Sequence, residues 1–329
     1  MPISVIEKTI NSNFANIDFK AKNIEYTATS NLKRSILNDT NISIEIVEKN
    51  KFYIYIRFVD FHEILVNNFY YNNRRFKIQI CELNKLKSSK SIAWFLITMY
   101  YGAFFASNEI SNLAGYFNFN FDQSEKDILF NKNKAINHHV SLEFKNSEIK
   151  NFFGELSLCD EPNTIKITCI NGGGKPHELS WSTLVKLLKS DTSYDADVFA
   201  RTSRFKNILT SDKKWKRPNR IRNEWNYSRA ELYTEDDTEN LSDIQKYFNN
   251  YKELKRWAET RQDYSRGISD DIVSVMFVLN VLEKVMLKLE TKLLWGKQTK
   301  NEIKDINKME GISLHTHITK RRKKGKKKK

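Results

Sequence analysis

Cysteine is scarce in this sequence, and its spacing excludes two kinds of stabilised fold. The 329 residues include only Cys81, Cys159 and Cys169, and no two of them have the close spacing of a zinc or redox motif. Neither a disulfide framework nor a resident metal is therefore expected. We expect the three thiols to be small buried side chains in a reducing compartment, the cytoplasm.

Long apolar runs are missing as well. The longest, IAWFLITMYYGAFFA at residues 92–106, is shorter than the roughly 20 residues that a membrane-spanning helix needs. It predicts a buried helix of a globular protein instead. The first residues, MPISVIEKTI, lack the basic start and apolar run of a secretion signal. We therefore expect a cytoplasmic protein without a membrane partner.

Several common catalytic and ligand-binding patterns are also absent. The segment NGGGKP at 171–176 lacks the spacing and the Ser or Thr of a phosphate-binding P-loop, so it predicts a turn from a strand to a helix. His138 and His139 have no Cys, Asp or Glu at ligand spacing, so neither metal nor cofactor binding is expected. No Ser-His-Asp or Cys-His arrangement can be assembled from local spacing.

Positive charge is abundant and unevenly placed. The formal net charge is +15, and nine of the last ten residues, KRRKKGKKKK, are Lys or Arg. Such a tail stays solvated and attracts polyanions without reading their sequence. Nucleic acid is the first candidate partner and an anionic membrane surface the second, while a purely solubilising role is the alternative.

The apolar pattern predicts an α+β fold in which helices dominate. We expect three parts: a small α/β N-terminal unit at 1–85, a helical domain at 86–295 with a strand-rich insertion at 117–175, and a flexible basic tail at 296–329. Whether the insertion forms its own lobe or extends the sheet of the first unit is left open by the sequence.

Strands are expected where apolar and polar residues alternate. Residues 41–61 alternate on both sides of a charged Glu-Lys-Asn-Lys turn and predict a hairpin, and FKIQICEL at 76–83 predicts a third strand. The insertion contains three more candidate strands, FNFNF, VSLEF and TIKITCI.

Helices are expected in most of the remaining chain. The segment 91–115 is apolar almost all round in its first four turns and should end at Gly115. Ser242 and Gln245 form a capping-box pattern, and the last helix has an unbroken apolar seam from Ile268 to Leu293. We favour packing of this seam within its own bundle over packing across a dimer. Further helices are predicted at 177–190, 194–209 and 219–233.

Residues 201–229 combine cations with aromatic rings, a mixture that suits RNA or single strands because cations hold phosphates while rings stack on unpaired bases. Phe205 and Trp225 are expected to pack inward, whereas Trp215 is the better stacking candidate. The predicted nucleic-acid-binding residues are Arg201, Arg204, Lys213, Lys214, Trp215, Lys216, Arg217, Arg220 and Arg229.

Four segments taken in order resemble the HEPN superfamily over roughly residues 91–294. They are MYYGAFFASNEISNLAG (99–115), HELSW (177–181), IRNEWNY (221–227) and the closing apolar helix. HEPN proteins are helical domains common in prokaryotic toxin–antitoxin, abortive-infection and CRISPR-linked systems. Many are metal-independent ribonucleases that act as dimers, and their signature is an Arg, a polar residue and then a His a few positions later.

The resemblance implies catalytic roles for residues of IRNEWNY. Arg222 would hold the phosphate, Asn223 and Asn226 would orient it, and Tyr227 would donate a proton or stack. The expected His is missing, because Asn226 and Tyr227 occupy its positions, and neither side chain shuttles protons well near neutral pH. His177, His138 and His139 could replace it only if the fold brings one of them close.

Another Arg-to-His pair, Arg57 and His62 in RFVDFH, is rejected as a chance match at a strand end. The sequence thus predicts an RNA-binding HEPN-like protein whose stronger form is an endoribonuclease of antiphage defence or a toxin–antitoxin system. It would be a homodimer or would join a defence-system partner. The alternative is a non-catalytic scaffold, sensor or antitoxin that dimerises and binds nucleic acid. A DNA-binding regulator is less favoured, because no recognition helix stands out.

Overall fold

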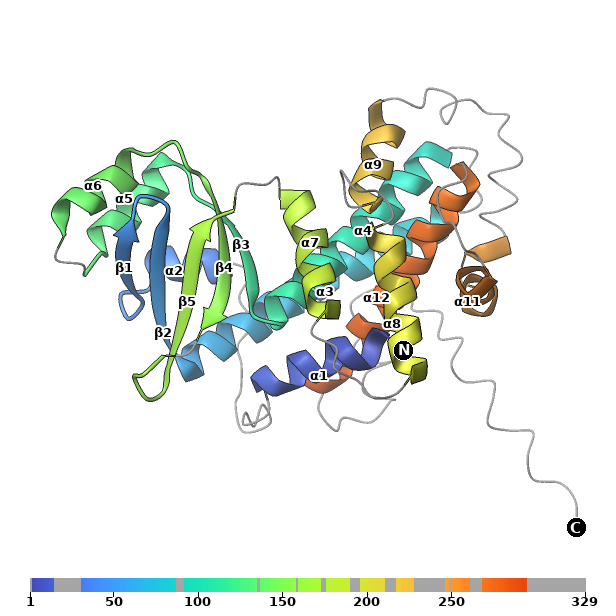
Figure 1. Ribbon diagram of the computed structural model, residues 1–329, viewed down its shortest axis with the longest axis horizontal. Coiled ribbons are helices and arrows are strands. Elements are labelled where there is room, and N and C mark those ends of the chain that lie inside the picture. The colour runs from blue at the N-terminus through green and yellow to red at the C-terminus, as the bar shows by residue number, and fades with distance from the viewer. Residues whose placement is uncertain are drawn as a thin grey trace, which may run out of the picture.

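The computed structural model of the chain has a sheet at one end and a group of helices at the other (Figure 1). This arrangement confirms the predicted α+β class. No helix within the described ranges is long and apolar enough to cross a membrane. The structure describes residues 2–14, 31–86, 92–134, 137–157, 159–172, 176–189, 196–210, 217–227, 246–248, 250–260 and 268–294.

The sheet is antiparallel and draws its strands from two distant parts of the chain. The order is β1-β2-β5-β4-β3. The predicted hairpin is confirmed, and the segment 117–175 extends the same sheet rather than forming its own lobe, because β5 pairs with β2 from Lys51 opposite Ile170 to Arg57 opposite Thr164. The strands are β1 (Ser43–Glu48), β2 (Lys51–Arg57), β3 (Tyr116–Asn120), β4 (Asn151–Ser157) and β5 (Thr164–Asn171).

Alternation along the strands gives the sheet one apolar face and one mixed face. Phe52 and Phe152 on the apolar face pack edge-on with ring centroids 5.1 Å apart, and Phe144 of α6 closes over both. The helices on this side are α2 (Leu32–Asn38), α5 (Gln123–Asn131) and α6 (His138–Asn146). The opposite face carries half-buried tyrosine, phenylalanine and lysine side chains.

The free edge of β1 is already occupied. The backbone N–H of Lys134 donates to the Ile44 carbonyl oxygen at 2.9 Å, and the Ile46 N–H donates to the Asn133 side chain at 2.8 Å. The segment that follows α5 therefore satisfies hydrogen-bonding groups that an edge strand would otherwise present to solvent.

Two of the strand predictions are wrong. FKIQICEL lies inside the helix α3 (Phe58–Leu86), where Phe76 and Leu83 are buried two turns apart while Ile78 is 49% exposed. VSLEF lies inside α6, whose N-terminus is capped by the Asn137 side chain and which buries Ser141 and Phe144. Both short segments fit a period of 3.6 as well as a period of 2, and tertiary packing selects the helix.

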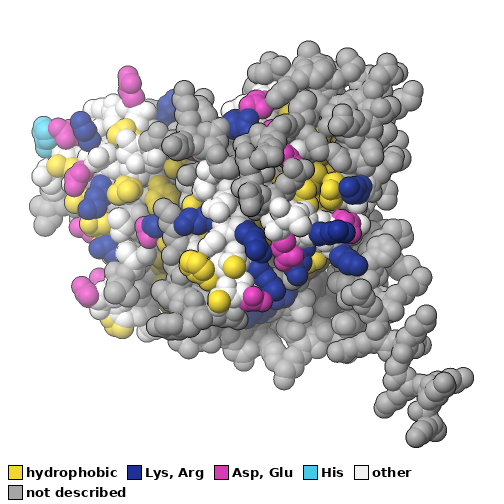
Figure 2. All heavy atoms as spheres, turned by 45° about the vertical axis from the view of Figure 1, so that its right-hand side comes forward, with side chains coloured by type: hydrophobic (Ala, Val, Ile, Leu, Met, Phe, Trp, Pro, Cys, Tyr) yellow, Lys and Arg dark blue, Asp and Glu magenta, His cyan; other side chains and the backbone are white. Residues whose placement is uncertain are grey.

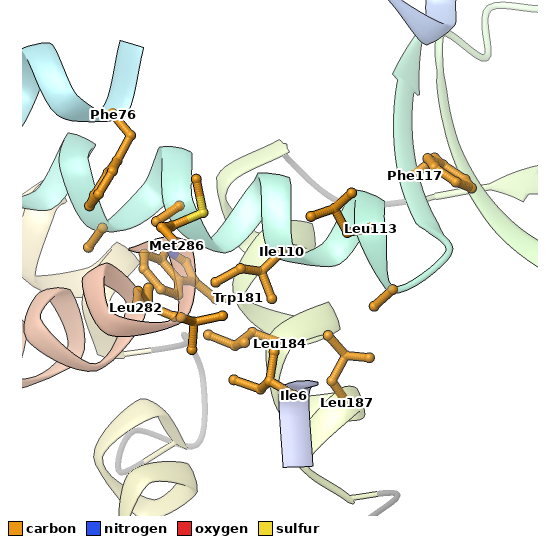
Figure 3. Packing of buried hydrophobic residues seen from close by; sticks show 14 of the residues in the cluster. Ile6, Phe76, Ile110, Leu113, Phe117, Trp181, Leu184, Leu187, Leu282 and Met286 are labelled. Atoms are coloured by element: carbon orange, nitrogen blue, oxygen red, sulfur yellow. The ribbon is translucent and has the colours of Figure 1, made fainter. Parts of the chain in front are cut away.

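The helix α4 (Ile92–Leu113) is the centre of the helical part. It contacts α3, α7, α9 and α12, and Trp181, Leu184 and Met286 gather around its middle with residues of α1 (Figure 3). Gly115 follows it with φ of +88°, and a side chain there would collide with Leu156. The predicted helix and its stop are thus confirmed. The other helices are α1 (Pro2–Phe14), α7 (Pro176–Lys189), α8 (Ala196–Thr210), α9 (Arg217–Tyr227), α11 (Tyr251–Thr260) and α12 (Ile268–Leu293).

The seam of α12 packs within its own chain, as favoured from the sequence. Its buried residues, such as Leu279 and Leu282, face α4, and the helix also contacts α1, α3 and α11. Lys77 of α3 forms a buried ion pair with Glu290 of α12. The predicted capping box at Ser242 and Gln245 and the tail at 296–329 lie outside the described residues.

The expectation of buried thiols holds for one cysteine only. Cys169 is completely buried on β5, where burial raises its pKa, whereas Cys81 and Cys159 are half-buried. All three are free thiols.

Glu109 of α4 is a buried carboxyl group surrounded by amides. Its carboxylate oxygens accept hydrogen bonds from the side-chain N–H groups of Asn72 at 2.5 Å, Asn68 at 3.1 Å and Asn112 at 3.3 Å. Burial raises its pKa to about 7, because desolvation of the charged form outweighs these three bonds. The folded state therefore binds a proton that the unfolded chain releases at lower pH.

We expect Glu109→Gln to stabilise the protein increasingly as pH rises. Below the unfolded pKa of about 4.5, the Glu109 carboxyl is protonated in both states and costs the wild type no stability. As the pH rises through 7, ionisation of this group in the unfolded chain lowers the free energy of unfolding by up to about 3 kcal/mol. Gln keeps the amide partners without titrating. The free energy of unfolding, measured with urea at several pH values, should show this widening gap. A gap that does not change with pH contradicts the prediction, and exposed Glu143→Gln is the control.

Candidate active site between helices α4, α7 and α9

Helix α9 is oriented by two buried side chains one turn apart. Ile221 is fully buried and Trp225 is 2% exposed, so this face of α9 enters the bundle between α4, α7 and α8. The inward packing predicted for Trp225 is confirmed, as is that of Phe205 on α8. Anchoring this face turns the neighbouring residue, Arg222, toward α4.

Arg222 is half-buried and donates hydrogen bonds to Tyr101 of α4 and to Asn223. Its Nη2 donates to the hydroxyl oxygen of Tyr101 at 3.0 Å, and its Nη1 donates to the Asn223 side-chain oxygen at 2.9 Å. The guanidinium carbon lies 5.9 Å from the centroid of the Tyr101 ring. These contacts with Tyr101 and Asn223 help to fix the orientation of the guanidinium.

His177 reaches the same part of α4 from the first turn of α7. Its Nδ1 lies 3.0 Å from the Tyr100 hydroxyl, and its ring stacks on Phe104 with centroids 4.2 Å apart. One turn further, the Trp181 indole N–H donates to the same Tyr100 oxygen at 3.3 Å. Across the part of the chain that is described, Nε2 of His177 has no hydrogen-bond partner. The ring is therefore fixed by one nitrogen and keeps the other available.

The electrostatics of the site favour a neutral imidazole beside a cation. The pKa of His177 is lowered, first by desolvation and then by the positive charge of Arg222. Burial raises the pKa of Tyr100, so its hydroxyl stays protonated. At neutral pH the site thus combines a base that can accept a proton with a guanidinium that can bind an anion.

The structure brings together only some of the residues predicted for catalysis. Arg222 and Asn223 touch, Asn226 lies half-buried one turn further on α9, and the Tyr227 side chain lies outside the described residues. Of the three alternative histidines, only His177 is near Arg222. His138 and His139 lie on α6, at the end of the molecule opposite α9 (Figure 1).

Arg57 and His62, the Arg-to-His pair rejected from the sequence, are bonded to other groups in the fold. Arg57 bonds to Asp60 with an Nε to Oδ2 distance of 2.5 Å. His62 is buried in α3, with its ring nitrogens at the carbonyl oxygens of Phe58 and Asn13.

The predicted basic surface is partly engaged in the fold. Arg220 bonds to Glu224 at 2.5 Å and to Asp271 of α12 at 3.4 Å, and Arg201 pairs with Asp197 at 3.2 Å. Arg204 is half-buried. The described surface in Figure 2 mixes Lys and Arg with Asp and Glu. Outside the described residues lie the side chain of Arg217 and all of Lys213, Lys214, Trp215, Lys216 and Arg229.

Sequence reasoning assigned Tyr100, Tyr101 and Phe104 to the core and so missed their contribution. The available signal was a pair of hydroxyl-bearing rings in the mostly apolar first four turns of the helix. A buried tyrosine hydroxyl needs a hydrogen-bond partner, so such a pair indicates polar neighbours on the helices that pack against it.

Comparisons with models of protein families, with curated proteins and with solved structures find no match to this chain. The geometry of the site is therefore the basis of the functional argument.

We expect Arg222→Gln to raise the pKa of His177. The substitution removes a positive charge that disfavours the imidazolium, while the desolvation that also lowers this pKa stays. The pH titration of the His177 ring protons by NMR measures the change. Arg201→Gln, on α8 and paired with Asp197, is the matched control and should leave the titration in place. An unchanged His177 pKa in Arg222→Gln would show that the two side chains are not coupled.

Proposed function

We propose that this protein is an RNA-binding, HEPN-like endoribonuclease that cleaves without a metal ion, using Arg222 and His177. The observation that supports it is the convergence of these two residues, from separate helices, on the adjacent tyrosines of α4. His177 supplies the imidazole that is missing from IRNEWNY, and the charge of Arg222 already acts on its pKa.

The proposed reaction is an internal transesterification. In the tautomer whose Nδ1–H donates to the Tyr100 oxygen, Nε2 of His177 is unprotonated and accepts the proton of a ribose 2′-hydroxyl, whose oxygen attacks the adjacent phosphorus. The bond from phosphorus to the 5′-oxygen breaks, and that oxygen takes a proton from water. The products are a 2′,3′-cyclic phosphate and a 5′-hydroxyl end, and His177 later releases its proton to solvent.

Arg222 stabilises the negative charge that develops on the phosphate oxygens during attack. Its hydrogen bonds to Tyr101 and Asn223 help to hold the guanidinium in place before substrate arrives, so little reorganisation is needed. The Tyr101 oxygen accepts from Arg222, which leaves its own hydrogen for a phosphate oxygen. Asn223 is in this view a positioning residue.

The biological setting follows from the resemblance to HEPN proteins. It implies a role in antiphage defence or a toxin–antitoxin system, with a homodimer or a defence-system partner. A homodimer would place two copies of the site near one RNA strand, and the basic tail would add affinity that falls as salt rises.

We expect cleavage of labelled single-stranded RNA in the presence of a chelator, with cyclic-phosphate ends detected by gel and mass spectrometry. Removal of the base or of the cation, by His177→Asn or Arg222→Ala, should each lower the rate at least about a hundred-fold. The controls are His139→Asn on α6 and Arg34→Ala, an exposed residue of α2, which should keep the wild-type rate.

Cleavage that persists in both His177→Asn and Arg222→Ala overturns this assignment, once the same activity is absent from a mock purification. RNA binding without any cleavage by the wild type would instead favour the non-catalytic scaffold, sensor or antitoxin.

A further inference from the structure

The mixed face of the sheet carries a set of aromatic rings, here called the aromatic face: Tyr53 and Tyr55 on β2, Phe153 on β4 and Tyr116 on β3. All four alternate with buried core residues and are half-buried on the side opposite the covering helices. Strand register places Tyr53 opposite Thr168, Thr168 opposite Glu155 and Glu155 opposite Tyr116, so the rings extend across the sheet.

Lysine ammonium groups lie directly over these rings. Lys166 is 3.8 Å from the Tyr53 ring centroid and 5.8 Å from that of Tyr55. Lys51 is 5.5 Å from Tyr53. Neither Lys51 nor Lys166 has a carboxylate at ion-pair distance within the described ranges, so their charges stay available to an anion. Lys186 of α7, 4.7 Å from Tyr116, is paired with Glu155 at 2.7 Å.

A hollow of about 820 Å³ borders the β1 end of this face. Tyr55 and Lys166 line it together with the carboxylates of Glu45, Asp160 and Glu161. These acids disfavour phosphate inside the hollow, but carboxylates accept hydrogen bonds from the amino groups of bases. A strand lying on the face would therefore turn bases toward these carboxylates, and phosphates toward Lys51 and toward Lys166 at the border of the hollow.

We propose that the aromatic face binds single-stranded RNA, with unpaired bases stacked on Tyr53, Tyr55 and Phe153 and phosphates held by Lys51 and Lys166, whose ammonium groups leave the Tyr53 ring as a base stacks on it. Rings next to unpaired cations suit unpaired bases, whose flat faces are hidden in a duplex. A protein partner would need a continuous apolar patch, and the described exposed apolar residue on this face is Ile170, 45% exposed. That the bound single strand is RNA rests on the proposed function.

Helix α7 connects the aromatic face to the candidate active site. Helix α7 starts five residues after Asn171, the last residue of β5, and His177 lies in its first turn. Further along α7, Lys186 touches Tyr116 and Phe153. The same helix therefore carries both a contact to the sheet and the proposed catalytic base. RNA bound to the aromatic face would lie next to the helix that carries this base.

The test measures binding separately from cleavage. The probe is a fluorescent 2′-O-methyl RNA of mixed sequence, about 12 nucleotides long, which has no 2′-hydroxyl to attack and suits a single-strand site. Fluorescence anisotropy at about 0.2 M salt limits the contribution of the basic tail. We expect the double substitution Tyr53→Leu and Phe153→Leu to weaken binding at least about ten-fold. Phe199→Leu, an aromatic of α8 that is 57% exposed, is the matched control and should bind like the wild type.

Equal affinity of the wild type and the double variant overturns the proposal, as does equal affinity for duplex RNA. Should the double variant fail to fold, ultraviolet cross-linking of the wild type locates the bound strand, and cross-links that avoid β2 and β4 overturn the proposal equally. Because the probe cannot be cleaved, this test measures binding alone. If binding to the aromatic face is refuted, the proposal that His177 and Arg222 cleave RNA still stands, and if cleavage is refuted, the binding result still stands.

Discussion

The hydroxyl of Tyr100 is a polar group that the bundle must satisfy internally, since the side chain is completely buried on α4. Trp181 donates to its oxygen, and His177 lies beside it, one helical turn before Trp181. Satisfying one buried oxygen thus fixes the rotation of α7 against α4. That rotation in turn decides which way the imidazole faces, and the neighbouring Tyr101 does the same for the guanidinium of Arg222.

The elements that could be predicted from the sequence are those whose pattern extends over several turns or is bounded by clear signals. The apolar helix at α4, its glycine stop, the seam of α12 and the first hairpin are all of this kind. FKIQICEL and VSLEF were assigned wrongly because five to eight alternating residues fit either period, and only the packing of Phe76 or Phe144 decides between them.

Only one of the two main residues of the candidate site, Arg222, could be predicted from the sequence. Arg222 stood out because of its motif, but the partner imidazole is 45 positions earlier in the chain, and no local spacing connects the two. Their meeting depends on the order of α7, α8 and α9 around α4, which is a property of the tertiary fold. The sheet shows the same limit, since its central strand pairing joins β2 to β5 across more than one hundred residues.

The occupied edge of β1 has a consequence for how copies of the chain can associate. An unprotected edge strand offers its backbone to any other strand, and neighbouring molecules can then line up into continuous ribbons that no longer dissolve. Asn133 and Lys134 already bond to the N–H of Ile46 and the carbonyl oxygen of Ile44 along that edge. A second sheet could pair with β1 at these positions only by displacing the segment that follows α5.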